Sequence, residues 1–175
     1  MEHESPYLAT ADAVRARNAA LDHEIRAFAA NIRPETLHTL PGADEWTLAE
    51  LLAHLAEFPR YFADDLALLL RQDAAAVGRT HEHPERLAAV AAAHGRTLAS
   101  LRADLDAALD ALARQLDAIK DEDLSRTTQN RKYGAEPLRA FLDRYVLSHK
   151  AGHLDQLRKT QERVQGDGQP FASVQ

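Results

Sequence analysis

Cysteine is absent from this chain of 175 residues. The chain by itself therefore forms no disulfide, thiolate metal site or iron–sulfur cluster, and it holds no cysteine nucleophile. Glycine and proline are scarce at 7 residues each, and aromatic residues make up only 6%. Because β-sandwiches and barrels need β-branched strands and many turn residues, this composition argues against an all-β fold.

Excess positive charge and long apolar runs are also lacking. The formal net charge is −6, so little is gained from counterion release and we expect no general nucleic-acid binding. No apolar run approaches the roughly 18 residues of a membrane span, so we expect none. The first residues lack a basic region followed by an apolar core, which is not the pattern of a signal peptide. We therefore expect a cytoplasmic protein.

Alanine and leucine at helical spacing dominate what is present, and both are strong helix formers. The apolar stripes predict four helices, over residues 8–32, 47–72, 84–119 and 137–163. Connectors at 34–46, 73–83 and 120–136 join them, and no segment carries a strand signal. We predict an all-α fold in which residues 1–175 form a single four-helix bundle, with a disordered tail from about residue 165.

The start of the second helix is the best specified boundary. Thr47 and Glu50 have the spacing of a capping box, in which each side chain accepts the other residue's backbone N–H. Trp46 and Leu51 flank that box as a hydrophobic staple does. Pro59 lies inside the same apolar run, where we expect it to kink the helix.

Two histidines in the last helix occupy positions where leucine would be the ordinary choice. His149 and His153 lie four residues apart in the inner stripe, so they face the same way at about 6 Å separation. That spacing suits two ligands of one metal ion. The alternative is a pair of core histidines bonded to other side chains, because a lone His-x-x-x-His pattern is short and common.

A third histidine strengthens the metal hypothesis. His54 lies one turn beyond Glu50, at the edge of the inner stripe, and therefore points to a seam between helices. Burial of three imidazoles without partners would cost several kcal/mol. One divalent ion would satisfy one nitrogen of each ring. Imidazole suits zinc, nickel, copper and iron, so the ligands by themselves do not select the metal.

These residues together resemble the DinB/YfiT-like superfamily of metal-dependent four-helix-bundle proteins. The resemblance covers about residues 8–163 and rests on Trp46-Thr47-x-x-Glu50-x-x-x-His54-Leu55 and His149-x-x-x-His153-x-x-Gln156. It implies helices in up-down-down-up order and one divalent metal, usually nickel or zinc, on His54, His149 and His153. It also implies, for some relatives, a transferase or isomerase that uses a low-molecular-weight thiol of the mycothiol or bacillithiol type. Many relatives have no established activity.

The implied helix order makes the connector at 73–83 cross the length of the bundle. Eleven extended residues reach at most about 36–40 Å, and the second helix spans about 38 Å, so the crossing is nearly taut. If the second and third helices are parallel, His54 and His94 lie within about 5 Å of one level. His94 is then a candidate fourth ligand, a candidate hydrogen-bond partner of a ligand, or a candidate general base. The alternative is a packing role.

Tyr145 is the other candidate for chemistry, because it lies one turn before His149 on the same face. Its hydroxyl could donate a hydrogen bond to a metal-bound atom, although a core tyrosine with its hydroxyl at a seam is the alternative. Three histidine ligands leave coordination positions open, as in catalytic rather than structural zinc sites.

Three hypotheses for function follow from these residues. The first is a metalloenzyme that activates water or, by the resemblance, a low-molecular-weight thiol toward a small-molecule substrate. It would be a thiol S-transferase, an isomerase or a hydrolase. The second is a non-catalytic metal-binding stress-response protein in which the ion staples helices together, and the third is a bundle without metal. We also expect a homodimer, because the family is often dimeric and alanine-rich faces allow close helix contact.

Overall fold

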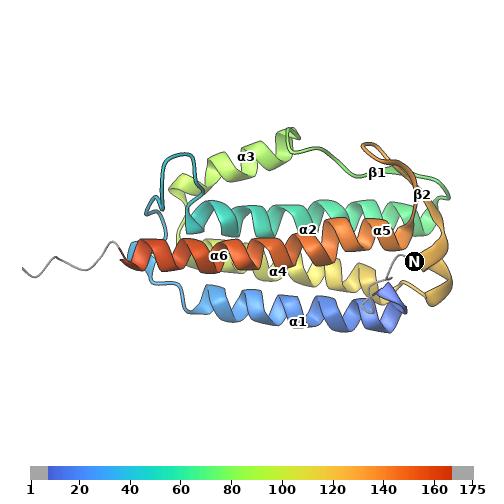
Figure 1. Ribbon diagram of the computed structural model, residues 1–175, viewed down its shortest axis with the longest axis horizontal. Coiled ribbons are helices and arrows are strands. Elements are labelled where there is room, and N and C mark those ends of the chain that lie inside the picture. Colours follow the sequence, from blue (N-terminus) through green and yellow to red (C-terminus); the bar gives the residue numbers. More distant parts are fainter. Residues whose placement is uncertain (1–7, 167–175) are drawn as a thin grey trace, which may run out of the picture.

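Four long helical segments lie side by side in the computed structural model, which describes residues 8–166 (Figure 1). Three are single helices: α1 (Ala11–Ala30), α2 (Leu48–Arg71) and α4 (Leu98–Asp117). The fourth is continuous and consists of α5 (Leu138–Phe141), the π-helical η5 (Leu142–Leu147) and α6 (Ser148–Gly166). The predicted helical bundle is confirmed. Among the described helices, none is long and apolar enough to cross a membrane.

The N-terminus of α2 forms as the sequence predicts. Thr47 Oγ1 accepts the backbone N–H of Glu50 at 3.2 Å, and Glu50 Oε2 accepts the backbone N–H of Thr47 at 2.7 Å. The helix continues through Pro59 to Arg71 and buries most of its residues, which makes it the central helix of the bundle. The predicted disordered tail lies outside the described residues except for its first two residues, which belong to α6.

Two arginines link α1 to α4, and the two helices run in opposite directions. Arg102, near the start of α4, donates to the carbonyls of Ala29 and Ala30 at the end of α1, at 2.7 and 2.9 Å. Arg15, near the start of α1, donates to the carbonyls of Leu116 and Ile119, where α4 ends. The last carbonyls of a helix have no partner within it, so each arginine caps the neighbouring helix.

The helices α2 and α4 run in the same direction. Glu50 lies 3.5 Å from His94, just before α4, and Arg60 lies 3.3 Å from Asp104 further along both helices. Figure 1 shows α1 and α6 running the opposite way. The chain therefore has to return along the bundle between α2 and α4.

That return is made by a separate helix, so the single helix predicted over 84–119 is wrong. In its place are α3 (Pro84–Ala92), the 3-10 turn η3 (Ala93–Gly95) and then α4. Arg96 is extended, and the Thr97 side chain caps α4 by accepting the N–H of Ser100. These local signals, a glycine followed by a capping threonine, interrupt a stripe that otherwise reads as one helix.

The connector predicted over 120–136 contains strands that the sequence analysis did not find. After the 3-10 turn η4 (Asp121–Ser125), the strands β2 (Thr127–Asn130) and β3 (Gly134–Pro137) form an antiparallel hairpin. The short strand β1 (Ala76–Val77), which follows α2, pairs parallel to β2. The strand β1 has only two residues, and β2 and β3 are short and mostly polar, so none shows the apolar alternation that marks a strand in sequence. The small sheet closes one end of the bundle (Figure 1).

A polar cluster is buried where α1 meets α6. The Lys150 side chain is fully buried, and its Nζ contacts Asn18 and Asp22 on α1. Burial raises the pKa of Asp22 and lowers that of Lys150, while their direct contact opposes both shifts. A charged pair in this position requires its partners, because either charge alone in the core would be strongly destabilising.

Candidate metal centre

The structure brings the three predicted histidine ligands together. His54 extends from α2, while His149 and His153 extend from α6, one turn apart. One ring nitrogen from each histidine lies within 4.8 Å of the others, and His54 Nε2 is 3.1 Å from His149 Nε2. The His54 residue is only 1% exposed. Two helices far apart in sequence thus present three imidazoles to one point.

Aromatic rings hold these imidazoles in place. Phe58, one turn after His54, stacks on His149 with 4.2 Å between ring centroids. Trp46 packs edge-on against His54 at 5.3 Å and stacks on His153 at 6.3 Å. The staple residue at the start of α2 is therefore also a wall of the histidine site. Such apolar walls restrict ring rotation and keep water away from the nitrogens.

Polar side chains face the second ring nitrogen of His153 and of His54. Gln156 Oε1 lies 3.0 Å from His153 Nδ1, and Glu57 Oε2 lies 3.6 Å from His54 Nδ1. At 3.6 Å the Glu57 contact is electrostatic, because within residues 8–166 the buried His54 Nδ1 has no hydrogen-bond partner. An acceptor at Nδ1 favours the tautomer in which Nε2 carries a free lone pair, the form that binds a metal ion.

The histidines are also held neutral. Burial, together with the neighbouring His153 and His54, lowers the pKa of His149 to about 2. Burial and the neighbouring His54 lower the pKa of His153 to about 4, and burial lowers that of His54. Neutral imidazoles are the metal-binding form, so nothing has to be deprotonated near pH 7. Three neutral nitrogens without a thiolate fit a divalent transition-metal ion with open positions.

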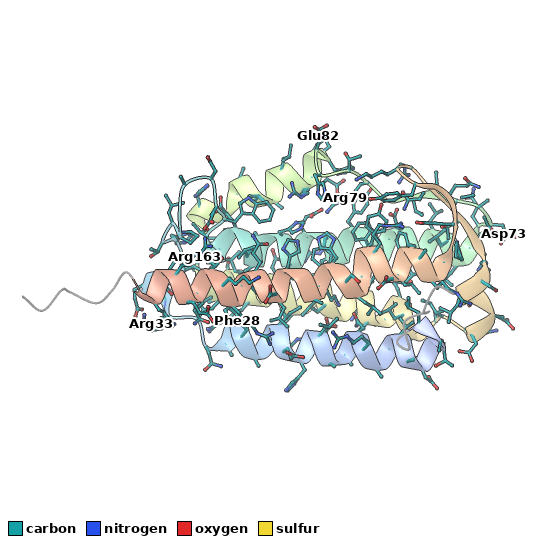
Figure 2. All side chains as sticks on the ribbon, viewed as in Figure 1. Phe28, Arg33, Asp73, Arg79, Glu82 and Arg163 are labelled. Carbon is teal, nitrogen blue, oxygen red and sulfur yellow. The ribbon has the colours of Figure 1, made fainter. Side chains whose placement is uncertain are left out.

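An arginine–glutamate pair next to the histidines was missed by the sequence analysis. Arg79 Nη2 donates to Glu57 Oε2 at 2.6 Å, Nη1 donates to the other oxygen, and the guanidinium lies 4.2 Å from the Tyr61 ring centroid. Arg79 belongs to the segment between β1 and α3 (Figure 2). The three-residue spacing of Glu57 from His54 was a usable signal, because such residues are neighbours on a helix. No local signal connects Arg79 to either of them.

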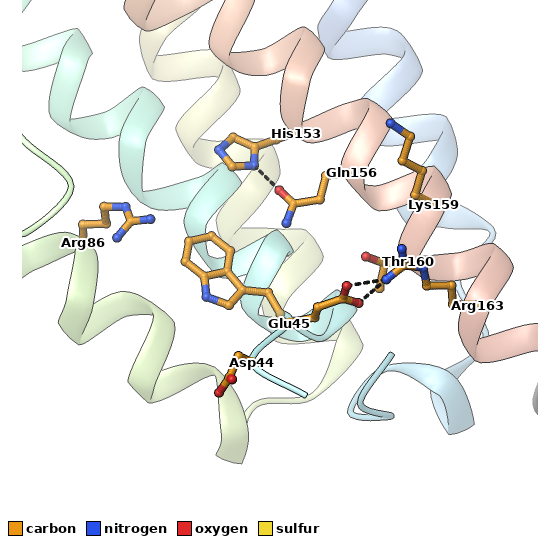
Figure 3. Close-up of a pocket in the computed structure, with 9 residues that line it drawn as sticks. Asp44, Glu45, Arg86, His153, Gln156, Lys159, Thr160 and Arg163 are labelled. Carbon is orange, nitrogen blue, oxygen red and sulfur yellow. Dashed lines mark hydrogen bonds and ion pairs between the residues drawn. The ribbon is translucent and has the colours of Figure 1, made fainter. Parts of the chain in front are cut away.

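Two cavities reach the histidines from different sides. The first, of about 230 Å³, is called the arginine chamber here, and its lining includes His54, His149, Arg79, Arg86, Lys132 and Arg144. The second, of about 350 Å³, reaches His153 and is lined by Glu45, Gln156, Lys159 and Arg163 among others. Figure 3 shows the second cavity, with Arg86 facing it across from His153. Arg86 lines both cavities.

The structure places His94 outside the histidine group and Tyr145 in the lining of the arginine chamber. His94 lies in η3 with its side chain 67% exposed, 3.5 Å from Glu50, and outside the histidine group. The inward position expected for it is wrong, because the third helix breaks beside it. Tyr145 is buried in η5 and lines the arginine chamber. Its hydroxyl is hydrogen-bonded to the side chain of Asn130 at 3.1 Å.

Comparisons with known proteins agree with this fold. A family model described as the mycothiol maleylpyruvate isomerase N-terminal domain matches residues 18–163. The structure resembles that of YfiT from Bacillus subtilis, described as a probable metal-dependent hydrolase with an unusual four-helix bundle topology. The TM-score is 0.74 at 16% identity, and the match covers 94% of this chain and 92% of YfiT.

Two further solved structures share the fold. A Streptococcus pneumoniae protein has a TM-score of 0.68 at 14% identity, over 89% of this chain and 92% of that one. An uncharacterized protein from Clostridium difficile 630 has a TM-score of 0.67 at 13% identity, over 87% of this chain and 95% of that one. No curated protein matches the sequence.

Proposed function

Because the chain belongs to the mycothiol maleylpyruvate isomerase N-terminal domain family, we propose that it is a metal-dependent enzyme. One divalent ion, zinc or nickel, would be bound by His54, His149 and His153. The predicted membership of the DinB/YfiT-like superfamily is confirmed by the family match and the YfiT fold. The observation that carries the proposal is the three-histidine group, with a cavity on either side of it.

When bound, the ion would supply a Lewis acid that lowers the pKa of water or of a thiol at an open position. The family's description favours a low-molecular-weight thiol, and YfiT's description favours water. Since the chain has no cysteine, a thiol would have to come from a second small molecule. Two cavities that meet at one histidine group suit a reaction between two small molecules.

The chain's own residues prepare this site before any substrate arrives. Glu57 and Gln156 orient two of the imidazoles, while Trp46 and Phe58 hold the rings and exclude water. The helix directions support the up-down-down-up order, in which antiparallel α2 and α6 bring His54 opposite the other two histidines. Preorganised ligands of this kind reduce the cost of binding the ion.

Metal analysis of protein purified without an affinity tag tests the proposal. We expect close to one divalent ion per chain, and we expect His149→Ala and His153→Ala to lose it. His23→Ala is the matched control, because His23 is an exposed α1 residue outside the group. Full metal occupancy in either ligand variant would show that the ligand assignment is wrong.

Turnover separates an enzyme from a protein in which the ion only staples α2 to α6. The metal-loaded protein would be assayed with low-molecular-weight thiols and electrophiles, and separately with hydrolysable esters and amides. Activity that disappears in His149→Ala but persists in His23→Ala supports the enzyme. Metal binding with no turnover in either assay supports the staple.

A further inference from the structure

We infer that the arginine chamber binds the anionic end of the substrate, a small dianionic oxyanion such as a dicarboxylate or a phosphate monoester, and that Arg86 contacts it. This inference rests on the proposed function, because it names the substrate class of the same site. It follows from the positively charged side chains that line the chamber, some of which have no carboxylate partner among the described residues.

Two of the chamber's arginines already have carboxylate partners. Arg79 forms its bidentate pair with Glu57. Arg144 Nη1 lies 2.7 and 2.8 Å from the two carboxylate oxygens of Glu136. These pairs are close to neutral as units, so they frame the chamber without giving it net charge.

Arg86 has no such partner. Its Nη1 donates to the backbone carbonyl of His81 at 2.8 Å, and its guanidinium lies 4.9 Å from the Trp46 ring centroid. Within residues 8–166 no carboxylate lies within ion-pair distance of it, and the residue is only partly exposed. Burial and the neighbouring Arg79 cation lower its pKa more than the Glu57 carboxylate raises it, so on balance the surroundings disfavour the charge. A bound anion would relieve this cost.

Lys132, an exposed residue of the chamber's lining, adds a second cation without a carboxylate partner among the described residues. It lies in the turn between β2 and β3, with its Nζ 5.1 Å from the Tyr133 ring centroid. In the part of the chain that the structure describes, it makes no ion pair. Two unpaired positive charges on one cavity match a ligand of charge −2, although the chain as a whole carries −6. A local positive field of this kind attracts anions.

The chamber's size and position select a small ligand that reaches the histidines. Its volume of about 230 Å³ fits a short organic acid or phosphate ester. His54 and His149 line the same space. An oxyanion held by Arg86 would therefore fix the substrate's other end beside the histidine group, and such positioning is a major source of rate enhancement.

Calorimetric titration of metal-free protein, prepared with a chelator, tests this inference. Metal-free protein is required because an oxyanion would also bind a metal ion directly. The probes are succinate, phenyl phosphate and uncharged succinamide. We expect at least one oxyanion to bind and succinamide not to bind, and the oxyanion that binds identifies the source. Trp46 is the chain's single tryptophan and contacts Arg86, so its fluorescence should follow the same titration.

Variants assign the binding to Arg86. Arg86→Gln should weaken oxyanion binding by about tenfold or more, the scale of a lost charge-assisted contact. Arg86→Lys should keep part of the affinity, and Lys132→Gln should show a smaller loss than Arg86→Gln. Arg158→Gln is the matched control, because Arg158 pairs with Glu24 outside both cavities, and it should bind as the parent protein does.

Three results would overturn the inference: no binding of either oxyanion, equal binding of succinamide, or unchanged affinity in Arg86→Gln. Its failure is distinct from failure of the proposed function, which is read from metal content. A protein that holds metal but no oxyanion refutes only the chamber's role. A protein with Arg86-dependent oxyanion binding and no metal refutes only the metal site.

Discussion

Glu57 faces a candidate metal ligand, His54, and also pairs with the buried cation of Arg79. Burial by itself would raise the pKa of its carboxyl, but contacts with His54 and Arg79 outweigh burial and lower the pKa to about 2. The carboxylate is therefore ionised throughout the physiological pH range. It accepts from Arg79 on one side and faces His54 Nδ1 on the other. Its negative charge favours the His54 tautomer that carries the proton on Nδ1 and leaves the Nε2 lone pair free.

We predict that Glu57→Gln weakens metal binding by about 10- to 100-fold, the effect usual for removing a neighbouring group that orients a metal ligand. The amide keeps the shape but neither carries the charge that favours His54 Nδ1–H nor balances Arg79. Chelator competition measures the affinity. Glu24→Gln, which removes a surface carboxylate of α1, is the control and should leave the affinity unchanged. Parent-like affinity in Glu57→Gln would show that His54 is oriented by packing alone.

At the scale of elements, the segment between α2 and α3 is tied down at Gly78. Its backbone N–H donates to Asp65 on α2 at 2.8 Å, and its carbonyl accepts from Arg131 at 3.0 Å. Its φ is +82°, in the left-handed region that favours glycine. This anchor immediately precedes Arg79, so it places one wall of the arginine chamber.

We predict that Gly78→Ala destabilises the protein more than Gly134→Ala. Both glycines have similar positive φ values, +82° and +78°, so the backbone strain is matched. At Gly78 a Cβ would come within 2.9 Å of the Tyr145 hydroxyl and 3.0 Å of Asn130, whereas at Gly134 nothing lies within 4 Å. Urea denaturation should show about 1–3 kcal/mol of additional loss for Gly78→Ala. Equal losses would mean that the segment moves aside freely.

At the scale of the whole molecule, the lowered pKa values of the grouped histidines predict that the metal-free protein is sensitive to acid. Unfolded histidines take up protons near pH 6.5, whereas folded His153 and His149 do so only near pH 4 and pH 2. Between these values the unfolded chain binds more protons, so the free energy of unfolding falls as pH drops below about 6.5. Each unit of depression expressed at a given pH corresponds to about 1.4 kcal/mol.

We therefore predict that metal-free protein is less stable to urea at pH 5 than at pH 7.5, measured by denaturation at both values. His153→Ala should reduce this pH dependence, because it removes one depressed group, while exposed His23→Ala should preserve it. A free energy of unfolding that is the same at both pH values would contradict the burial of neutral imidazoles.

The homodimer expected from the sequence stays a prediction, which light scattering at micromolar concentration tests. One alanine-rich face of the kind that this prediction invokes includes Ala88 and Ala92, which lie exposed on α3. Close packing of such small side chains is possible against a second copy. A measured mass equal to one 19.4 kDa chain would contradict the dimer.

The amino-acid sequence was enough to predict the bundle, the start of α2 and the three histidines of the candidate site. These features depend on helical periodicity and on contacts within a few residues, which are readable along one chain. The spacing of His149 and His153 places both on one face, and the cap at Thr47 fixes the register of His54. The family resemblance joined the two helices into one site.

Packing between elements produces the hairpin that covers one end of the bundle and the arginine chamber beside the histidines, and no local pattern predicted either. The break in the third helix has a local signal in Gly95 and the capping Thr97, but the apolar stripe that continues across it predicts a single helix. A helical stripe does not show whether packing supports one long helix or two short ones, so the inward position expected for His94 was wrong. The pairs Arg79–Glu57 and Arg144–Glu136 join different structural elements. Their formation depends on how those elements pack, and the same packing leaves Arg86 without a carboxylate partner among the described residues.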